Sequence, residues 1–98
     1  MRAPEEFKDF CIPFDPGIFE QDKDVYLPGE DVISFAVRQA SDRRKQIVKA
    51  FIEDLLAAKL SDRELAEIWA QGHSRVGFVN VEDYRRVFEK ILALLRRD

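Results

Sequence analysis

From Gly29 onward, hydrophobic residues recur about every 3.6 positions, the spacing of one face of an α-helix. The chain therefore predicts a helix that follows Gly29 and a second helix that Ser41 and Asp42 can cap. One kinked rod would satisfy the same pattern, so both arrangements stay open. The positions expected to be buried are Val32, Ile33, Ala36, Val37, Ala40, Ile47, Val48, Phe51, Ile52, Leu55 and Leu56.

Residues 60–72 predict a further helix with a defined start and end. Ser61 and Glu64 have the spacing of a capping box, in which each side chain accepts a hydrogen bond from the backbone amide of the other residue. Gly72 follows as a stop signal. The expected buried face consists of Leu65, Ile68 and Trp69.

The last helix is predicted to start at Asn80, a capping residue with Asp83 three positions on. Arg96 and Arg97 stand at its C-terminal end, where the helix dipole favours positive charge. The stretch before it, residues 75–80, fits a loop or a short apolar strand. The expected apolar stripe of the last helix is Tyr84, Val87, Phe88, Ile91, Leu92 and Leu95.

The first 28 residues follow no helical period and hold all four prolines and four of the eight phenylalanines. Proline disfavours a long helix or a central strand, whereas each phenylalanine gains about 1.5–3 kcal/mol by burial. We therefore expect an ordered, turn-rich segment that lies on the helices, with one helical turn near residues 5–10. The predicted fold is all-α: one domain over residues 1–98, with a segment (1–28) packed on a body (29–98) of three to four antiparallel helices.

The chain has 98 residues, of which 46% are hydrophobic and 36% charged, enough apolar material for one compact core. Cys11 and His73 are the only residues of their kinds, so an internal disulfide and a Cys/His zinc site within one chain are excluded. The first residues lack the apolar region of a secretory signal, and no stretch approaches the roughly 20 apolar residues of a membrane span. We expect a cytoplasmic protein.

Charge divides the chain unevenly. Residues 1–31 hold nine acidic and three basic residues, a balance of −6, and residues 32–98 hold ten acidic and thirteen basic residues, a balance of +3. Such asymmetry suggests a charged partner. The basic clusters at 43–45, 85–86 and 96–97 fit solvated helix faces better than a nucleic-acid surface, which normally carries a strong basic excess.

The sequence contains no evident catalytic, metal or cofactor motif, and we expect a protein that is not an enzyme. His73 has no second His or Cys nearby in sequence, and Cys11 lies among aromatic residues that favour burial of its thiol. Asp22 and Asp24 occupy the first and third positions of a calcium loop. Tyr26 and Leu27 then stand where that loop requires an oxygen ligand and a glycine, so the match fails.

In residues 19–25, FEQDKDV, two apolar residues enclose a Gln and four charged residues, three of them acidic. They fit either a hydrated turn or a docking surface for a partner, and the acidic balance of the segment favours the docking surface. The residues predicted to bind the partner are Glu20, Asp22, Asp24, Glu30 and Asp31.

The chain also resembles the small immunity proteins of bacterial contact-dependent growth inhibition systems. That family carries an early motif of two aromatic residues, His, Gln, Asp and an aromatic residue; here residues 18–23 read IFEQDK, in which Phe19, Gln21 and Asp22 match. Ile18, Glu20 and Lys23 depart from it. The order of later segments is also similar over roughly residues 14–96, namely GEDVISFAV, LSDREL, a glycine-containing loop and DYRRVFEKILALL.

The resemblance implies a non-enzymatic, cytoplasmic inhibitor that binds a toxin domain delivered by a neighbouring cell. Many such toxins are nucleases, whose basic active sites suit an acidic partner. Two other functions remain open on the sequence. One is a helical adaptor that binds an apolar helix, and the other is a nucleic-acid-associated regulator that uses Arg43, Arg44, Lys45, Arg85 and Arg86.

Overall fold

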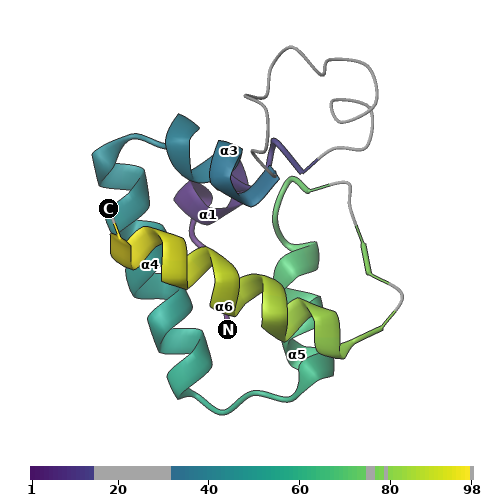
Figure 1. The fold of residues 1–98 in the computed structure, drawn as a ribbon. Helices are drawn as coiled ribbons and strands as arrows, with labels where there is room; N and C mark the ends of the chain where they lie inside the picture. The colour runs from purple at the N-terminus through teal and green to yellow at the C-terminus, as the bar shows by residue number, and fades with distance from the viewer. Residues whose placement is uncertain (15–31, 75–76, 79, 98) are drawn as a thin grey trace.

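The computed structural model describes residues 1–14, 32–74, 77–78 and 80–97. These residues form helices and connecting loops, with no strand in the described ranges, so the predicted all-α fold is confirmed (Figure 1). No helix in these ranges has both the length and the apolar character needed to cross a bilayer. The helices are α1 (Glu5–Phe10), α3 (Val32–Gln39), α4 (Asp42–Ala57), α5 (Asp62–Ala70) and α6 (Glu82–Arg97).

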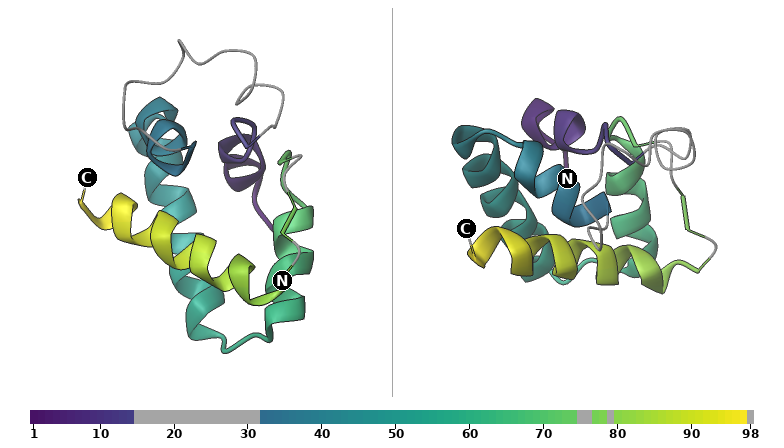
Figure 2. Two further views of the ribbon diagram at one scale, coloured as in Figure 1. Left: turned by 45° about the vertical axis from the view of Figure 1, so that its right-hand side comes forward. Right: turned by 45° about the horizontal axis from the view of Figure 1, so that its top comes forward.

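Helix α6 organises the body, because it packs against α3, α4 and α5. It runs across the front of the molecule in Figure 1. The right-hand view of Figure 2 shows α1 and α6 on opposite sides, with α3, α4 and α5 between them. Helix α1 packs on α4. Residues 1–14 thus form one side of the core.

The chain breaks between α3 and α4, which settles the choice between two helices and one kinked rod. Ser41 has extended backbone angles (φ −67°, ψ 161°), and its Oγ accepts a hydrogen bond from the backbone N–H of Arg44 at 3.2 Å. This contact satisfies one of the amides left without a partner at the start of a helix. Ser41 therefore acts as the predicted N-cap of a separate α4.

The predicted capping box of α5 is confirmed. The backbone N–H of Glu64 donates to Ser61 Oγ at 3.1 Å, and the backbone N–H of Ser61 donates to Glu64 Oε1 at 3.2 Å. Helix α6 begins at Glu82, two residues after Asn80, whose backbone oxygen accepts from the N–H of Asp83 at 3.1 Å. Within the stretch predicted as a loop or a strand, the described residues 77, 78 and 80 lie in a loop.

Aromatic rings fill the centre of the molecule. Trp69 is only 3% exposed and contacts the rings of Phe7, Phe14 and Phe88, with centroids 6.3, 5.0 and 5.7 Å apart. Offset and edge-to-face ring pairs add about 0.5–1.5 kcal/mol each to the free energy gained by burial. The helical turn expected near residues 5–10 is the six-residue helix α1, and it brings Phe7 into this cluster.

Not every position of the predicted stripes is fully buried. Val32, Leu56 and Tyr84 are only partly buried, and each lies within a turn of a helix end, where neighbouring helices cover less of the surface. Phe35, outside the predicted stripe, is buried, and the Arg38 guanidinium carbon lies 5.4 Å from its ring centroid. The other partly buried stripe positions are Ile47 and Val87.

Candidate functional site

The five residues predicted to bind a partner, Glu20, Asp22, Asp24, Glu30 and Asp31, all lie in residues 15–31, outside the described residues. Their role stays a prediction. The structure does describe residues 1–14, the first part of the acidic residues 1–31, and they belong to the folded domain. Ala3, Phe7, Phe10, Cys11 and Phe14 are all buried.

Helix α1 has one buried side and one polar side. Phe7 and Phe10 face the core, whereas Glu5 and Asp9, four positions apart, lie on the outer side. Residues four apart on a helix are neighbours on its surface. The outer side of α1 therefore presents two carboxylates from a fixed position.

The loop after α5 lies directly against α1. The backbone N–H of His73 donates to the carbonyl oxygen of Lys8 at 3.2 Å, and Ser74 Oγ donates to the carbonyl oxygen of Phe14 at 3.4 Å. These bonds join two segments that are far apart in sequence. They hold His73 beside the outer side of α1.

Gly72 has a different role from the one that the sequence predicted. Helix α5 does end just before it, with Gln71 as the C-cap, but Gly72 does not have the left-handed backbone of a helix-stopping glycine. A Cβ atom at this position would lie 3.0 Å from Cys11 Sγ. A side chain at this position would crowd the buried thiol, whereas glycine leaves the loop room to pass it.

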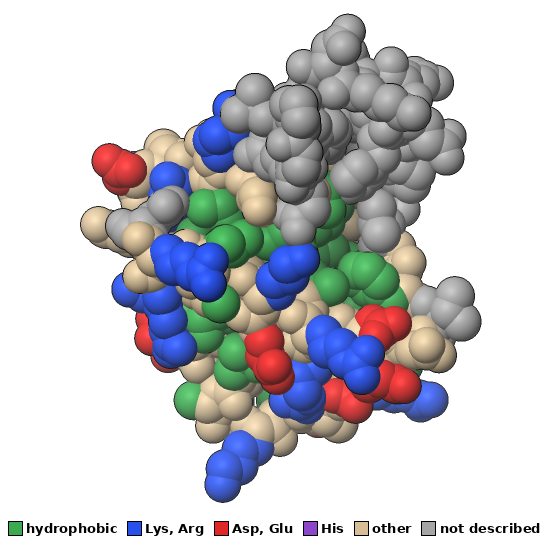
Figure 3. All heavy atoms as spheres, viewed as in Figure 1, with side chains coloured by type: hydrophobic (Ala, Val, Ile, Leu, Met, Phe, Trp, Pro, Cys, Tyr) green, Lys and Arg blue, Asp and Glu red, His purple; other side chains and the backbone are tan. Residues whose placement is uncertain are grey.

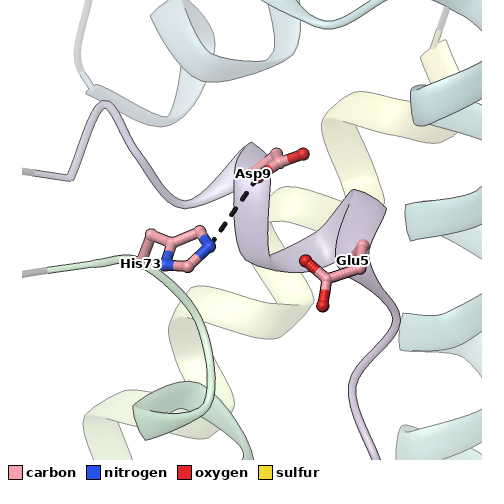
Figure 4. Close-up of side chains that lie close together, drawn as sticks. All are labelled: Glu5, Asp9 and His73. Carbon is pink, nitrogen blue, oxygen red and sulfur yellow. Dashed lines mark ion pairs between the residues drawn. The ribbon is translucent and has the colours of Figure 1, made fainter.

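Glu5, Asp9 and His73 form a cluster on the surface, here called the α1–His73 cluster (Figure 4). One ligating atom from each residue lies within 4.8 Å of the other two, and His73 Nε2 lies 3.8 Å from Asp9 Oδ1. Figure 4 shows the imidazole directed at Asp9. His73 is 53% exposed, in agreement with the predicted solvated loop position, but its acidic neighbours come from a distant part of the chain and gave no sequence signal.

Two cations flank the α1–His73 cluster. Lys8 Nζ lies 3.3 Å from Glu5 Oε1, and an Arg44 nitrogen lies 3.9 Å from Asp9 Oδ2. Arg44 and His73 therefore face different oxygens of the same carboxylate. Both ion pairs are exposed to solvent, and such pairs stabilise a fold by only about 0.2–1 kcal/mol.

Cys11 is buried, as the sequence predicted, and carries no disulfide. Burial raises the pKa of its thiol far above the ordinary value, because the apolar surroundings disfavour the thiolate. Only the thiolate is a strong nucleophile or metal ligand. Cys11 is a packing residue of the core.

A groove of about 640 Å³ separates the start of α4 from the end of α6. Its lining is mixed in charge, and one of its cations, Arg96, has a nitrogen 3.3 Å from Glu53 Oε2. Figure 3 shows basic side chains scattered over this face with acidic ones among them. The groove is lined by Asp42, Lys45, Gln46, Lys49, Leu95 and Arg96.

The basic residues of the nucleic-acid alternative do not gather in one place. Arg85 donates to Asp62 Oδ1 at 2.8 Å and to the carbonyl oxygen of Leu60 at 2.6 Å, so it joins α6 to the start of α5. Arg96, which lies in the groove near Lys45, is eleven residues further along α6, or about 16 Å. Arg85 therefore stabilises the fold at one end of α6, away from the cations at its other end.

No protein-family model matches this chain, and neither the curated proteins nor the solved structures searched contain a match.

Proposed function

We propose that this chain is a non-enzymatic immunity protein that binds and neutralises a bacterial toxin domain in the cytoplasm. The observation that carries the proposal is the balance of −6 over residues 1–31, on a segment whose start is anchored in the core by the buried side chains of Phe7, Phe10 and Phe14. The resemblance to contact-dependent growth inhibition immunity proteins supports the same function.

The anchored start of the acidic segment favours binding for a physical reason. Binding through charges held on a fixed base costs less conformational entropy than binding that must first order a free tail. Phe7 and Phe14 fix this base, since both rings contact Trp69. Glu5 and Asp9 already belong to its solvent-facing side.

Charge complementarity also sets the expected kinetics. An acidic surface raises the rate of encounter with a basic cleft, most strongly at low salt. A neutralising inhibitor needs a Kd near 1 nM or below, about −12 kcal/mol, across an interface of about 1,600 Å². The candidate residues remain Glu20, Asp22, Asp24, Glu30 and Asp31.

A helical adaptor is the second candidate, and it requires an apolar groove for a partner helix. The groove between α4 and α6 is lined almost wholly by polar residues. In the described ranges, the large hydrophobic residues with high exposure are Met1 and Ile12, eleven positions apart in residues 1–14, and Val81 just before α6. These observations favour the acidic docking surface over an apolar one.

Growth rescue tests the proposal. The toxin domain encoded next to this chain is expressed in bacterial cells with and without the chain, and rescue of growth together with a stable complex of the two purified proteins supports immunity. Absence of such a neighbouring gene, or a toxin that kills equally in the presence of the chain, contradicts it. A variant with Asp22→Lys and Asp24→Lys, which should rescue less well, tests the acidic surface separately.

A further inference from the structure

We propose that Glu5, Asp9 and His73, the α1–His73 cluster, bind a divalent transition-metal ion of the Zn²⁺ type. The cluster offers one imidazole nitrogen and two carboxylate oxygens, a donor set that suits Zn²⁺ and its neighbours in the first transition row. Mg²⁺ and Ca²⁺ prefer oxygen ligands throughout, so the imidazole favours the transition metals. Three protein ligands leave the fourth position for water.

The distances are close to those that a bound ion requires. Ligand bonds of about 2.0–2.2 Å in a tetrahedral site place the ligating atoms about 3.3–3.6 Å from one another. His73 Nε2 and Asp9 Oδ1 are already 3.8 Å apart, and all three ligating atoms lie within 4.8 Å. Rotation of exposed side chains can close the remaining gap without movement of the backbone.

The backbone beneath the ligands is held in place independently of any metal. Glu5 and Asp9 belong to α1, whose other side is buried in the core through Phe7. The hydrogen bond from the N–H of His73 to the carbonyl oxygen of Lys8 fixes the third ligand against the same helix. Gly72 also packs closely against Cys11, the residue that ends α1.

The neighbouring cations are compatible with this site. Arg44 lies near Oδ2 of Asp9 and leaves Oδ1 toward His73, as an outer partner that orients a ligand does. Lys8 competes for Glu5, but their exposed ion pair is weak and easily replaced by a divalent ion. The predicted consequence is a link between α1 and the loop after α5. Because the ion then binds only the folded chain, it raises the melting temperature.

The test uses the full chain, with Zn²⁺ titrated by calorimetry and in thermal melts. We expect saturable binding and a higher melting temperature with Zn²⁺, and neither effect with Mg²⁺. His73→Ala and Asp9→Asn should each weaken binding at least about tenfold. The matched control Glu89→Gln, which removes one carboxylate from an exposed position on α6, should bind as the wild type does.

Absence of Zn²⁺ binding in the wild type overturns the proposal. So does binding that persists unchanged in His73→Ala, because the ion would then lie elsewhere on the chain. Should His73→Ala lower the melting temperature in the absence of metal, Glu5→Gln replaces it, since the Glu5 side chain is 73% exposed. None of these outcomes depends on recognition of a toxin, so the two proposals fail separately.

Discussion

The ring of Phe14 meets the indole of Trp69 edge-on, with centroids 5.0 Å apart and ring planes at 89°. This contact joins the end of the described N-terminal segment to the helix that the sequence defines most clearly. Trp69 also touches Phe7 and Phe88, so one side chain links α1, α5 and α6. The acidic segment therefore begins at the core of the protein.

Replacement of Trp69 should remove this link. We expect Trp69→Ala to lower the free energy of unfolding by about 3–5 kcal/mol, because it leaves a cavity among aromatic rings. Urea denaturation measures the loss, and Val81→Ala, at a residue that is 47% exposed, is the control and should change stability by less than about 0.5 kcal/mol. Wild-type fluorescence like that of free tryptophan in buffer would contradict the burial of Trp69.

Phe7 tests whether the N-terminal segment belongs to the core. Its ring lies 5.2 Å from Phe51 and 5.9 Å from Phe88, between centroids, and it is fully buried. Phe7→Ala should therefore cost about 3–5 kcal/mol in urea denaturation. Ile12→Ala, at a residue that is 51% exposed, should cost little. If Phe7→Ala cost as little as Ile12→Ala is expected to cost, α1 would be dispensable for the fold.

Loss of the capping box of α5 should lower stability by less than the core substitutions at Trp69 and Phe7. Ser61→Ala removes the oxygen that accepts from the N–H of Glu64 and should cost about 1 kcal/mol. Glu64→Gln should be nearly neutral, since glutamine can accept from the N–H of Ser61 in the same way. Thermal melts of both variants check this difference, and a neutral Ser61→Ala would show that the box does not stabilise α5.

The buried thiol predicts a loss of stability at alkaline pH. Because burial raises the pKa of Cys11 in the folded state, the thiol stays protonated there, while the unfolded chain releases its proton above about pH 8.5. The stabilisation is complete below that pH and falls by about 1.4 kcal/mol for each unit above it, until the folded pKa is reached. Denaturation at pH 8 and pH 10 should show a smaller alkaline loss for Cys11→Ala than for the wild type. Parallel losses would contradict the prediction.

Much of the fold is predictable because its determinants are local. The period of the apolar positions and the capping residues Ser41 and Ser61 specify α4 and α5. The sequence left open whether α3 and α4 are separate, because a helical period fits the apolar positions on both sides of Ser41; the extended backbone of Ser41 decides for two helices. The sequence could not show the true reason for Gly72, which depends on the approach of Cys11 from a segment far away in sequence.

The two candidate sites also differ in how far the sequence alone predicts them. Acidic charge is visible in the amino-acid sequence, so the residue types alone single out residues 20–31. The α1–His73 cluster arises only when the loop after α5 bonds to α1 through the N–H of His73 and the oxygen of Lys8. Glu5 and Asp9 at helical spacing are the available signal, and nothing in the sequence connects them to the single histidine.

Association kinetics with a basic toxin domain test the central proposal most directly. Asp22→Lys with Asp24→Lys should slow association at low salt and weaken its dependence on ionic strength, because electrostatic steering is reduced. The matched control Glu82→Lys with Glu89→Lys makes the same change in net charge on α6. It should have a smaller effect, since those residues lie outside the predicted docking surface.

The decisive measurement is the association rate against ionic strength for the wild type and both double variants, with thermal melts alongside. We expect near-wild-type melting temperatures for both double variants and a selectively slower association rate for the Asp22 and Asp24 variant. Equal rates at low salt would reduce residues 19–25 to a hydrated turn. A large fall in the melting temperature of the Asp22 and Asp24 variant would instead mean that Asp22 stabilises the fold. Either result would contradict the acidic docking surface.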